Sequence, residues 1–195
     1  MIKIGITGGI GSGKSVVSEL LQLSGLPVYN ADKESKQLTD TSPLIRRKLI
    51  ELFGNELYSS GKLNKAILAS HIFGNPESLR LVNAIIHPEV NCHFSAWTEM
   101  QKTTICGIES AILFESGFNR VVDVTLMVYA PEEIRIQRAS ERDLTTREEI
   151  ERRIKNQLSD EIKKENCDYV IYNDGIQALI PQVTRFLHKI RQTES

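Results

Sequence analysis

The sequence lacks the features that mark secreted, membrane-spanning and zinc-binding chains. Its only cysteines are Cys92, Cys106 and Cys167, and no two of them form a CxxC pair. An odd number of widely spaced cysteines disfavours a disulfide framework and a zinc site, and it fits a reducing cytoplasm. No apolar run approaches the roughly 18 residues of a membrane-spanning helix, and the apolar start is too short for a signal peptide. We therefore expect a cytoplasmic protein with no membrane segment.

The charges show no excess of either sign. Lys and Arg number 24 against 25 Asp and Glu, which gives a formal net charge of −1. This balance provides no bulk positive field for a nucleic acid or an anionic membrane. The 195 residues, 41% of them hydrophobic and 25% charged, have the composition of a soluble globular domain, not of a disordered, collagen-like or coiled-coil chain. We expect one domain with room for a small insertion.

Short apolar runs alternate with helical patterns along most of the chain. Residues 2–7 are apolar and β-branched and stop at a glycine cluster, which predicts a buried parallel strand. Further strands are predicted at 27–30, 104–108 (continuing toward 113–115), 123–129 and 168–172. Alternating strands and helices indicate an α/β fold, here a doubly wound, five-stranded parallel sheet covered on both faces.

Two stretches depart from this alternation. Residues 35–102 show helical patterns and no convincing strand, and they are too long for an ordinary connection, so we expect a helical insertion beside the sheet. Within it, Pro88 should break or kink a helix. Residues 146–165 form a strongly charged helical pattern with few apolar residues, which indicates an exposed and mobile segment, and 176–190 reads as a terminal amphipathic helix.

The glycine cluster carries the strongest chemical signal. Residues 8–15 read GGIGSGKS and fit G-x-x-x-x-G-K-[ST] at every fixed position. Such glycines let several backbone N–H groups converge, and a helix starting near Lys14 adds its positive dipole end. Lys14 can contact β- and γ-phosphate oxygens, and the Ser15 hydroxyl can bind Mg²⁺. A chance glycine-rich turn is the alternative, but the strand before and the helix after favour a phosphate-binding loop.

A nucleotide-binding loop does not specify a reaction, because switch GTPases, mechanical ATPases and small-molecule kinases share it. A GTPase normally carries N-K-x-D, and residues 64–67 read NKAI, without the aspartate. A motor ATPase is usually larger. A kinase needs an acceptor pocket, a carboxylate near the acceptor hydroxyl and mobile arginines, and the sequence offers all three.

Two acidic residues are candidates for the acceptor side. Asp32 is expected at the end of the second strand, where it could accept the acceptor's proton; it could also cap a helix starting at Lys33. Glu115, at the end of 113–115, could face the acceptor or a water-bound metal, or it could be structural.

Basic residues supply further candidates. Arg138 and Arg142 are four residues apart, so they share one helix face and could close over the phosphates, although a solvated charged face is the alternative. His87, before Pro88, could donate to a ligand or could simply pack.

Several motifs, in order along nearly the whole chain, resemble those of the dephospho-CoA kinase family. They are Thr7–Ser15, Asn30-Ala31-Asp32, Gly61–Lys65, Ile86-His87-Pro88, Leu113-Phe114-Glu115, Gln137-Arg138, Arg142-Asp143 and Asp168–Ile171. The resemblance implies transfer of the ATP γ-phosphoryl group to the ribose 3′-hydroxyl of dephospho-CoA, the last step of coenzyme A synthesis. Another P-loop small-molecule or nucleoside/nucleotide kinase is the alternative, and a nucleotide-dependent switch is a rival of a different class.

The resemblance also implies an organisation and a set of site residues. The parts would be a core (1–34, 103–134 and 166–195), a helical CoA-binding insertion (35–102) and a lid (135–165), in a monomer or small homo-oligomer. Lys14, Asp32 and Arg142 would be catalytic, and Asp32, His87 and Glu115 would face dephospho-CoA. The residues implied in ATP binding are Gly11, Ser12, Gly13, Lys14, Ser15, Val16, Arg138, Asn173 and Gly175, with Ser15 also on Mg²⁺.

Overall fold

The computed structural model describes residues 1–59 and 61–192. The chain divides into two compact units, one formed by Met1–Tyr29 with Gln101–Ser195 and the other by Asn30–Met100. The elements of the first unit are β1 (Ile2–Thr7), α1 (Lys14–Leu23), β2 (Val28–Asn30, which reaches the boundary), β3 (Ile105–Glu109), the 3₁₀ helix η2 (Phe118–Arg120), β4 (Val124–Tyr129), α6 (Glu132–Asp143), α7 (Arg147–Ile154), α8 (Asp160–Glu165), β5 (Tyr169–Tyr172) and α9 (Leu179–Gln192). Those of the second are α2 (Ala31–Thr41), α3 (Pro43–Phe53), the 3₁₀ helix η1 (Asn55–Tyr58), α4 (Lys65–Ile72) and α5 (Pro76–Glu99).

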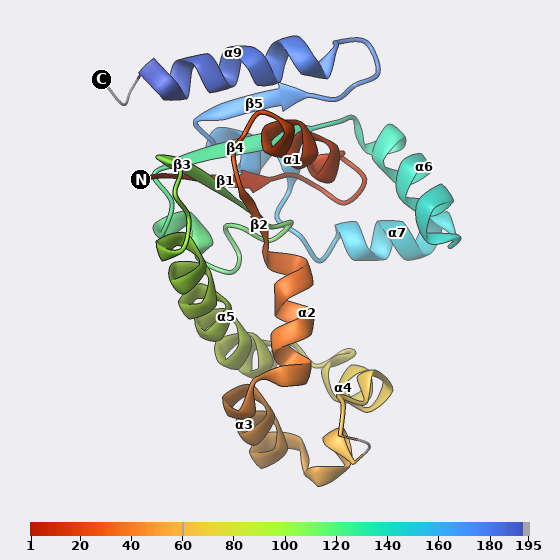
Figure 1. The fold of residues 1–195 in the computed structure, drawn as a ribbon. Coiled ribbons are helices and arrows are strands. Elements are labelled where there is room, and N and C mark those ends of the chain that lie inside the picture. The colour runs from red at the N-terminus through yellow and green to blue at the C-terminus, as the bar shows by residue number, and fades with distance from the viewer. Residues whose placement is uncertain (60, 193–195) are drawn as a thin grey trace. The chain divides into compact units, whose positions relative to one another are not determined.

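The five strands form one parallel sheet in the order β2-β3-β1-β4-β5, as predicted (Figure 1). β1 lies at the centre, paired with β3 on one side and with β4 on the other. The strand order therefore reverses at the carboxyl end of β1, which is where doubly wound sheets bind ligands. The glycine-rich loop starts at this point.

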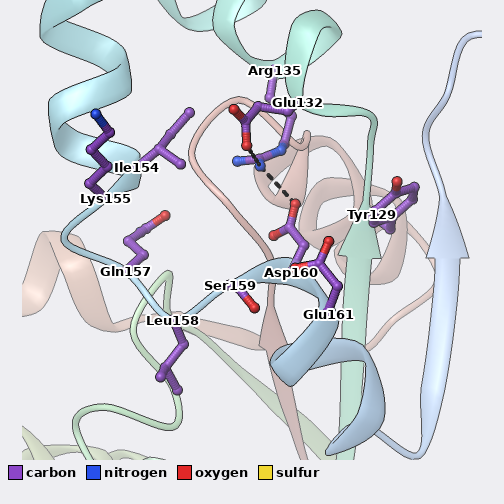
Figure 2. Close-up of a pocket in the computed structure, with 10 residues that line it drawn as sticks. All are labelled: Tyr129, Glu132, Arg135, Ile154, Lys155, Gln157, Leu158, Ser159, Asp160 and Glu161. Atoms are coloured by element: carbon purple, nitrogen blue, oxygen red, sulfur yellow. Dashed lines mark ion pairs between the residues drawn. The ribbon is translucent and has the colours of Figure 1, made fainter.

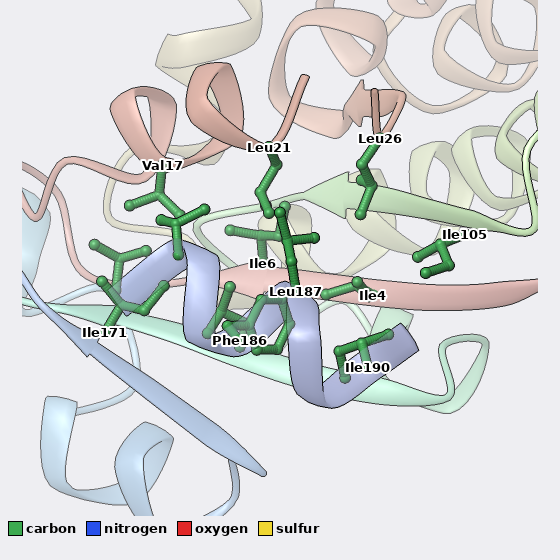
Figure 3. Close-up of a cluster of buried hydrophobic side chains, with 13 residues drawn as sticks. Ile4, Ile6, Val17, Leu21, Leu26, Ile105, Ile171, Phe186, Leu187 and Ile190 are labelled. Carbon is green, nitrogen blue, oxygen red and sulfur yellow. The ribbon is translucent and has the colours of Figure 1, made fainter. Parts of the chain in front are cut away.

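One face of the sheet is covered by α1 and α9 (Figure 3). Apolar residues of alternate strand positions meet apolar residues of both helices in a core that excludes water. Its fully enclosed members are Ile4, Ile6, Val17, Leu21, Leu26, Ile105, Leu126, Val128, Ile171, Val183, Phe186, Leu187 and Ile190.

The opposite face of the sheet is covered by the segment after β3 and by α8. A Cβ added at Gly5 would lie 2.8 Å from Leu113 Cδ2, so the segment after β3 packs directly on the middle of β1. Helix α8 packs against strand β4. The prediction that both faces are covered is therefore confirmed.

The second unit holds only helices and turns among its described residues beyond β2, as the patterns predict. Of the two outcomes expected at Pro88, a break or a kink, the break is wrong, because α5 continues from Pro76 to Glu99. Its buried residues recur every four positions on both sides of the proline: Val82, Ile86, Val90, Phe94 and Thr98. This continuous packed stripe offsets the backbone hydrogen bond that proline removes.

Three other expectations are corrected near the ends of elements. β3 ends at Glu109 and does not reach 113–115, where the N–H groups of Ser116 and Gly117 bond locally to the carbonyls of Ile112 and Phe114. The charged stretch 146–165 is two helices, α7 and α8, because Ser159 caps a new helix. The last helix starts at residue 179, because Asp174 holds the preceding residues in a turn. None of the described helices combines the length and the apolar character that crossing a membrane requires.

The core on α9 predicts a sharp contrast within one helix. Phe186→Ala should lower the free energy of unfolding by about 3–5 kcal/mol, because it removes a buried ring and leaves a cavity. Ile180→Ala, at a position 66% exposed on the same helix, should change it by less than about 0.5 kcal/mol. Urea denaturation of the full chain, followed by circular dichroism, measures both; equal losses would contradict this packing.

Candidate functional site

The loop between β1 and α1 has a backbone that only glycine can supply at two positions. Gly11 and Gly13 have φ of 78° and 92°, in the left-handed region. Space is closed as well: a Cβ at Gly11 would meet the carbonyl oxygen of Arg135, and one at Gly13 would meet Asn173 Nδ2. The loop is thus fixed in shape by its own glycines and by the residues that press on it.

This loop leaves polar groups available for an anion. α1 starts at Lys14 with no side-chain cap and no acidic residue in its first turn, so its dipole and N–H groups favour a negative ligand. The N–H groups of Gly11, Gly13 and Ser15 have no acceptor in the described part of the chain. The hydroxyl of Ser12 is buried and likewise has no partner among the described residues. A phosphate group offers the oxygen acceptors that all of these donors need.

Lys14 is buried and its ammonium group lies on the loop itself. Its Nζ donates to the carbonyl oxygens of Gly8 at 2.9 Å and Gly9 at 3.3 Å. The positive charge is therefore held beside the glycines, where phosphate oxygens can replace neutral carbonyls as stronger, charged partners.

A buried carboxylate that sequence reasoning missed lies beside Ser15. Glu109, the last residue of β3, is 5% exposed, and its Oε1 lies 3.4 Å from Ser15 Oγ, which donates to it. The sequence does carry a signal for Glu109, because this acid directly follows the strand residues ICGI. A strand that continues toward Glu115 hides it, since Glu109 then lies within the strand and not at its end. A hydroxyl and a carboxylate are the hard oxygen ligands that Mg²⁺ prefers.

These two residues could hold only part of a metal's coordination shell. The described residues contain no cluster of three or more His, Cys, Asp or Glu side chains that could bind a metal ion. The donor set therefore fits a magnesium ion that takes its other ligands from phosphates and water, as in other nucleotide sites.

Asn173 and Arg138 link the loop to β5 and α6. Asn173 Nδ2 donates to the Ser12 carbonyl at 2.8 Å, and Arg138 Nη1 donates to the Asn173 carbonyl at 3.0 Å. The structure thus brings these two predicted residues together with the loop. Gly175, with φ of 83°, lies in the turn that follows, where a Cβ would meet no described atom within 4 Å.

Arg142 lies at the end of α6 in an ion-pair cluster. Its guanidinium group binds both carboxylate oxygens of Asp143, at 2.7 and 3.2 Å, and Arg153 of α7 binds the same carboxylate at 2.7 Å. The hydrogen bonds from Arg142, and then from Arg153, lower the pKa of Asp143 to about 2. Arg142 is 60% exposed in its side chain and is held by its neighbour rather than by the loop.

Glu115 has structural partners in the first unit. Its Oε1 accepts from the Leu158 N–H at 2.8 Å and lies 3.5 Å from Lys163 Nζ. Lys163 is fully buried, which lowers its pKa, and it also donates to the Ala111 carbonyl. The sequence allowed either a ligand role or a structural role for Glu115. The contacts with Leu158 and Lys163 are those of a structural role.

The other two acceptor-side candidates belong to the second unit. Asp32 is exposed in the first turn of α2, so it does not end a strand. Nor is it the cap of a helix starting at Lys33: Asn30 caps α2, and its Oδ1 accepts from the Lys33 N–H at 2.8 Å. His87 is partly buried in α5, and this burial lowers the pKa of its imidazole. Burial therefore favours the neutral imidazole, which carries one N–H donor.

A pocket of about 230 Å³ adjoins the loop, and Arg135 lies at its wall (Figure 2). Its side chain is 4% exposed and pairs with Asp160 at 2.7 Å, with Glu132 lying 3.6 Å away. Burial raises the pKa of Asp160, and the positive charge of Arg135 opposes that rise. The charge pattern did not single out Arg135, because Arg138 and Arg142 carry the same charge on the same helix and burial cannot be read from the residue type.

Comparison with known proteins agrees with this geometry. The family model described as dephospho-CoA kinase matches residues 2–178. A Bacteroides fragilis protein named dephospho-CoA kinase is 52% identical over 95% of this chain and 91% of its own, and one from Porphyromonas gingivalis is 45% identical over 98% and 95%.

Solved structures share the fold. A Thermus thermophilus protein is 31% identical, with a TM-score of 0.84, over 100% of this chain and 98% of its own. The dephospho-CoA kinase from Campylobacter jejuni has a TM-score of 0.70 at 22% identity, over 99% and 98% of the two chains. The family match extends over the loop, α6, Asn173 and the second unit alike. The chain belongs to the dephospho-CoA kinase family.

Proposed function

We propose that this protein transfers the γ-phosphoryl group of ATP to the ribose 3′-hydroxyl of dephospho-CoA. The observation that carries the proposal is the glycine loop with buried Lys14 and an uncapped α1, in a chain whose relatives bear that activity in their names. The three cysteines are free thiols, which supports a cytoplasmic location. We expect a monomer or a small homo-oligomer.

The loop would bind the ATP phosphates and leave little covalent chemistry to the protein. Phosphoryl transfer passes through a loose transition state, so catalysis consists mainly of positioning and charge stabilisation. In this proposal Gly11–Val16 contact ATP, with the N–H groups of Gly11, Gly13 and Ser15 as backbone donors, and Lys14 exchanges the carbonyls of Gly8 and Gly9 for phosphate oxygens. Arg138 and Asn173 lie against the loop on its β5 side, with Gly175 in the following turn; we assign them to the nucleotide.

Magnesium fits the oxygen donors beside the loop. Ser15 would bind the ion directly, and Glu109 would orient the Ser15 hydroxyl or a water of the ion. Held there, magnesium would supply positive charge that offsets the negative charge of the phosphates during transfer. The chain itself places the Ser15 hydroxyl and the Glu109 carboxylate side by side, and it keeps water away from the buried Glu109 carboxylate.

Asp32 would act on the acceptor. An exposed carboxylate can accept a hydrogen bond from the 3′-hydroxyl, aim it at the γ-phosphorus and take its proton late in the transfer. His87 would donate from its neutral ring to dephospho-CoA. We assign Glu115 to the acceptor side as well, where the Leu158 N–H and Lys163 Nζ would orient its carboxylate.

Segment 135–165 would serve as a lid, with Arg142 as its mobile cation. A guanidinium group paired with one exposed carboxylate loses little when it leaves, because such pairs contribute about 0–1 kcal/mol. Polyphosphate carries more charge than Asp143 and can therefore draw Arg142 away during closure.

The runner-up is a P-loop kinase for another small hydroxyl compound. Shikimate kinases of two bacteria share the fold with TM-scores of 0.55 and 0.53, but at 17% and 18% identity they speak to the fold alone. The family membership supports dephospho-CoA as the acceptor instead.

An acceptor panel tests the substrate directly. With Mg²⁺ and ATP, ADP release should be faster with dephospho-CoA than with AMP, CMP or shikimate by well over about tenfold in kcat/KM. A preference for any other acceptor would refute the substrate proposal. Slow hydrolysis with strong guanine preference, and no phosphorylated product, would indicate a nucleotide switch instead.

Asp32→Asn tests the proposed carboxylate. Loss of a positioned base should lower kcat by on the order of 10²–10⁴ with little change in ATP affinity. Glu34→Gln is the control for a lost negative charge at this helix terminus, since Glu34 also lies in the first turn of α2, with His93 Nδ1 3.9 Å from its carboxylate. Near-native kcat in Asp32→Asn, or an equal fall of kcat in both variants, would show that Asp32 is not the catalytic carboxylate and contributes only to the start of α2.

Limited proteolysis tests closure of the lid. ATP should slow trypsin cleavage after Arg152, Arg153 and Lys155, which are exposed on or after α7, because closure orders that segment. Cleavage after Arg80 in α5, outside segment 135–165, serves as the internal control. Equal cleavage of the α7 sites with and without ATP would argue against closure.

A further inference from the structure

Ile10 of the glycine loop is held at its N–H, at its carbonyl and at its side chain. Its N–H donates to Gln157 Oε1 at 3.2 Å, and its carbonyl accepts from Arg135 Nη1 at 3.3 Å. Its side chain packs against the apolar cluster of Ile136, Ala139 and Ile150, which joins α6 to α7. The motif leaves this loop position open to any residue, yet here its N–H, its carbonyl and its side chain all have partners outside the loop.

The Gln157 side chain approaches from the connection between α7 and α8, at the edge of the pocket (Figure 2). The Gln157 N–H donates to the Ile154 carbonyl at 2.9 Å, and the connection is anchored further by two residues that follow Gln157. Leu158 donates its N–H to Glu115, and Asp160 pairs with buried Arg135. Gln157 Oε1 is therefore an acceptor held in place by its surroundings, not the end of a freely moving side chain.

Because Gln157 carries a neutral amide, it holds the Ile10 N–H without placing a negative charge beside the loop. Ile10 immediately precedes Gly11, whose N–H lies among the donors available to phosphate. A bond that fixes the Ile10 peptide also limits rotation of the next peptide, so it keeps those donors facing one way. Glutamate could accept the same bond, but its charge beside a polyphosphate would repel the ligand.

We propose that Gln157 is a positioning residue for ATP, which acts by holding the Ile10 N–H so that the loop donors after it face the phosphates. The inference rests on the proposed ATP-dependent function but not on the identity of the acceptor. It assigns to the lid connection a role in forming the phosphate site itself, separate from any closure by Arg142.

Calorimetric titration of the full-length protein with ATP, without acceptor, tests the proposal. Gln157→Leu keeps the side chain's bulk but removes the acceptor, and it should weaken ATP binding by roughly 3–10-fold, the range that one hydrogen bond accounts for. Gln157→Glu should weaken it at least as much, and by less at high salt because charge repulsion is screened. In steady-state assays KM for ATP should rise while KM for the acceptor stays unchanged.

Arg147→Gln is the matched control for a merely loosened α6–α7 pair. Arg147 of α7 joins the two helices through Glu133 of α6 and also pairs with Glu151 of its own helix, and none of its contacts in the described residues reaches the loop. It should lower the melting temperature as much as Gln157→Leu or more, and leave ATP binding unchanged. Wild-type ATP affinity in Gln157→Leu or, at low salt, in Gln157→Glu would overturn the proposal, as would an equal loss in Arg147→Gln.

The two ideas fail in different ways. If the wild type binds ATP but does not phosphorylate dephospho-CoA, the proposed acceptor is wrong and the comparison of Gln157 variants stands. If Gln157→Leu binds ATP like the wild type, the positioning role is wrong and the proposed reaction is untouched.

Discussion

The structure depends on keeping backbone N–H groups at the carboxyl end of β1 turned toward an anion. A loop of glycines is entropically costly to order, and left alone it would sample many conformations. Here the conformation is fixed from outside. Arg135 and Asn173 press on Gly11 and Gly13 so closely that no side chain fits, and Gln157 holds Ile10. The cost of ordering the loop is thus met during folding, before any phosphate binds.

This constraint explains why a charge-balanced chain can hold a highly charged ligand. The net charge of −1 gives no long-range attraction, so affinity must come from local groups in a site of low exposure. Lys14 is buried beside loop carbonyls, and the uncapped helix α1 adds its dipole. Arg135 also lies against the loop, where it donates to the Ile10 carbonyl, but its charge is paired with Asp160.

Structural features encoded by short runs of neighbouring residues could be predicted from the sequence. Five β-branched or apolar runs predicted the five strands, and eight consecutive residues predicted the loop, because both signals lie within single elements. Features that depend on where an element ends, or on distant packing, were missed. Glu109 was overlooked because β3 was extended to Glu115, and Asn30 rather than Asp32 caps α2. Pro88 does not end α5, because the packed stripe on both sides of it outweighs one lost hydrogen bond. Gln157 had no sequence signal, since its partner is a backbone N–H 147 residues away.

The most direct measurement of the central claim is the amide NMR spectrum of the loop during titration with a non-hydrolysable ATP analogue and Mg²⁺. Backbone N–H groups that donate to phosphate oxygens shift downfield and exchange more slowly with solvent. The account predicts large downfield shifts for Gly11, Gly13 and Ser15 at saturation, with Ile10 little changed because Gln157 already holds its N–H. Unshifted signals from the three loop amides at saturating nucleotide would contradict it.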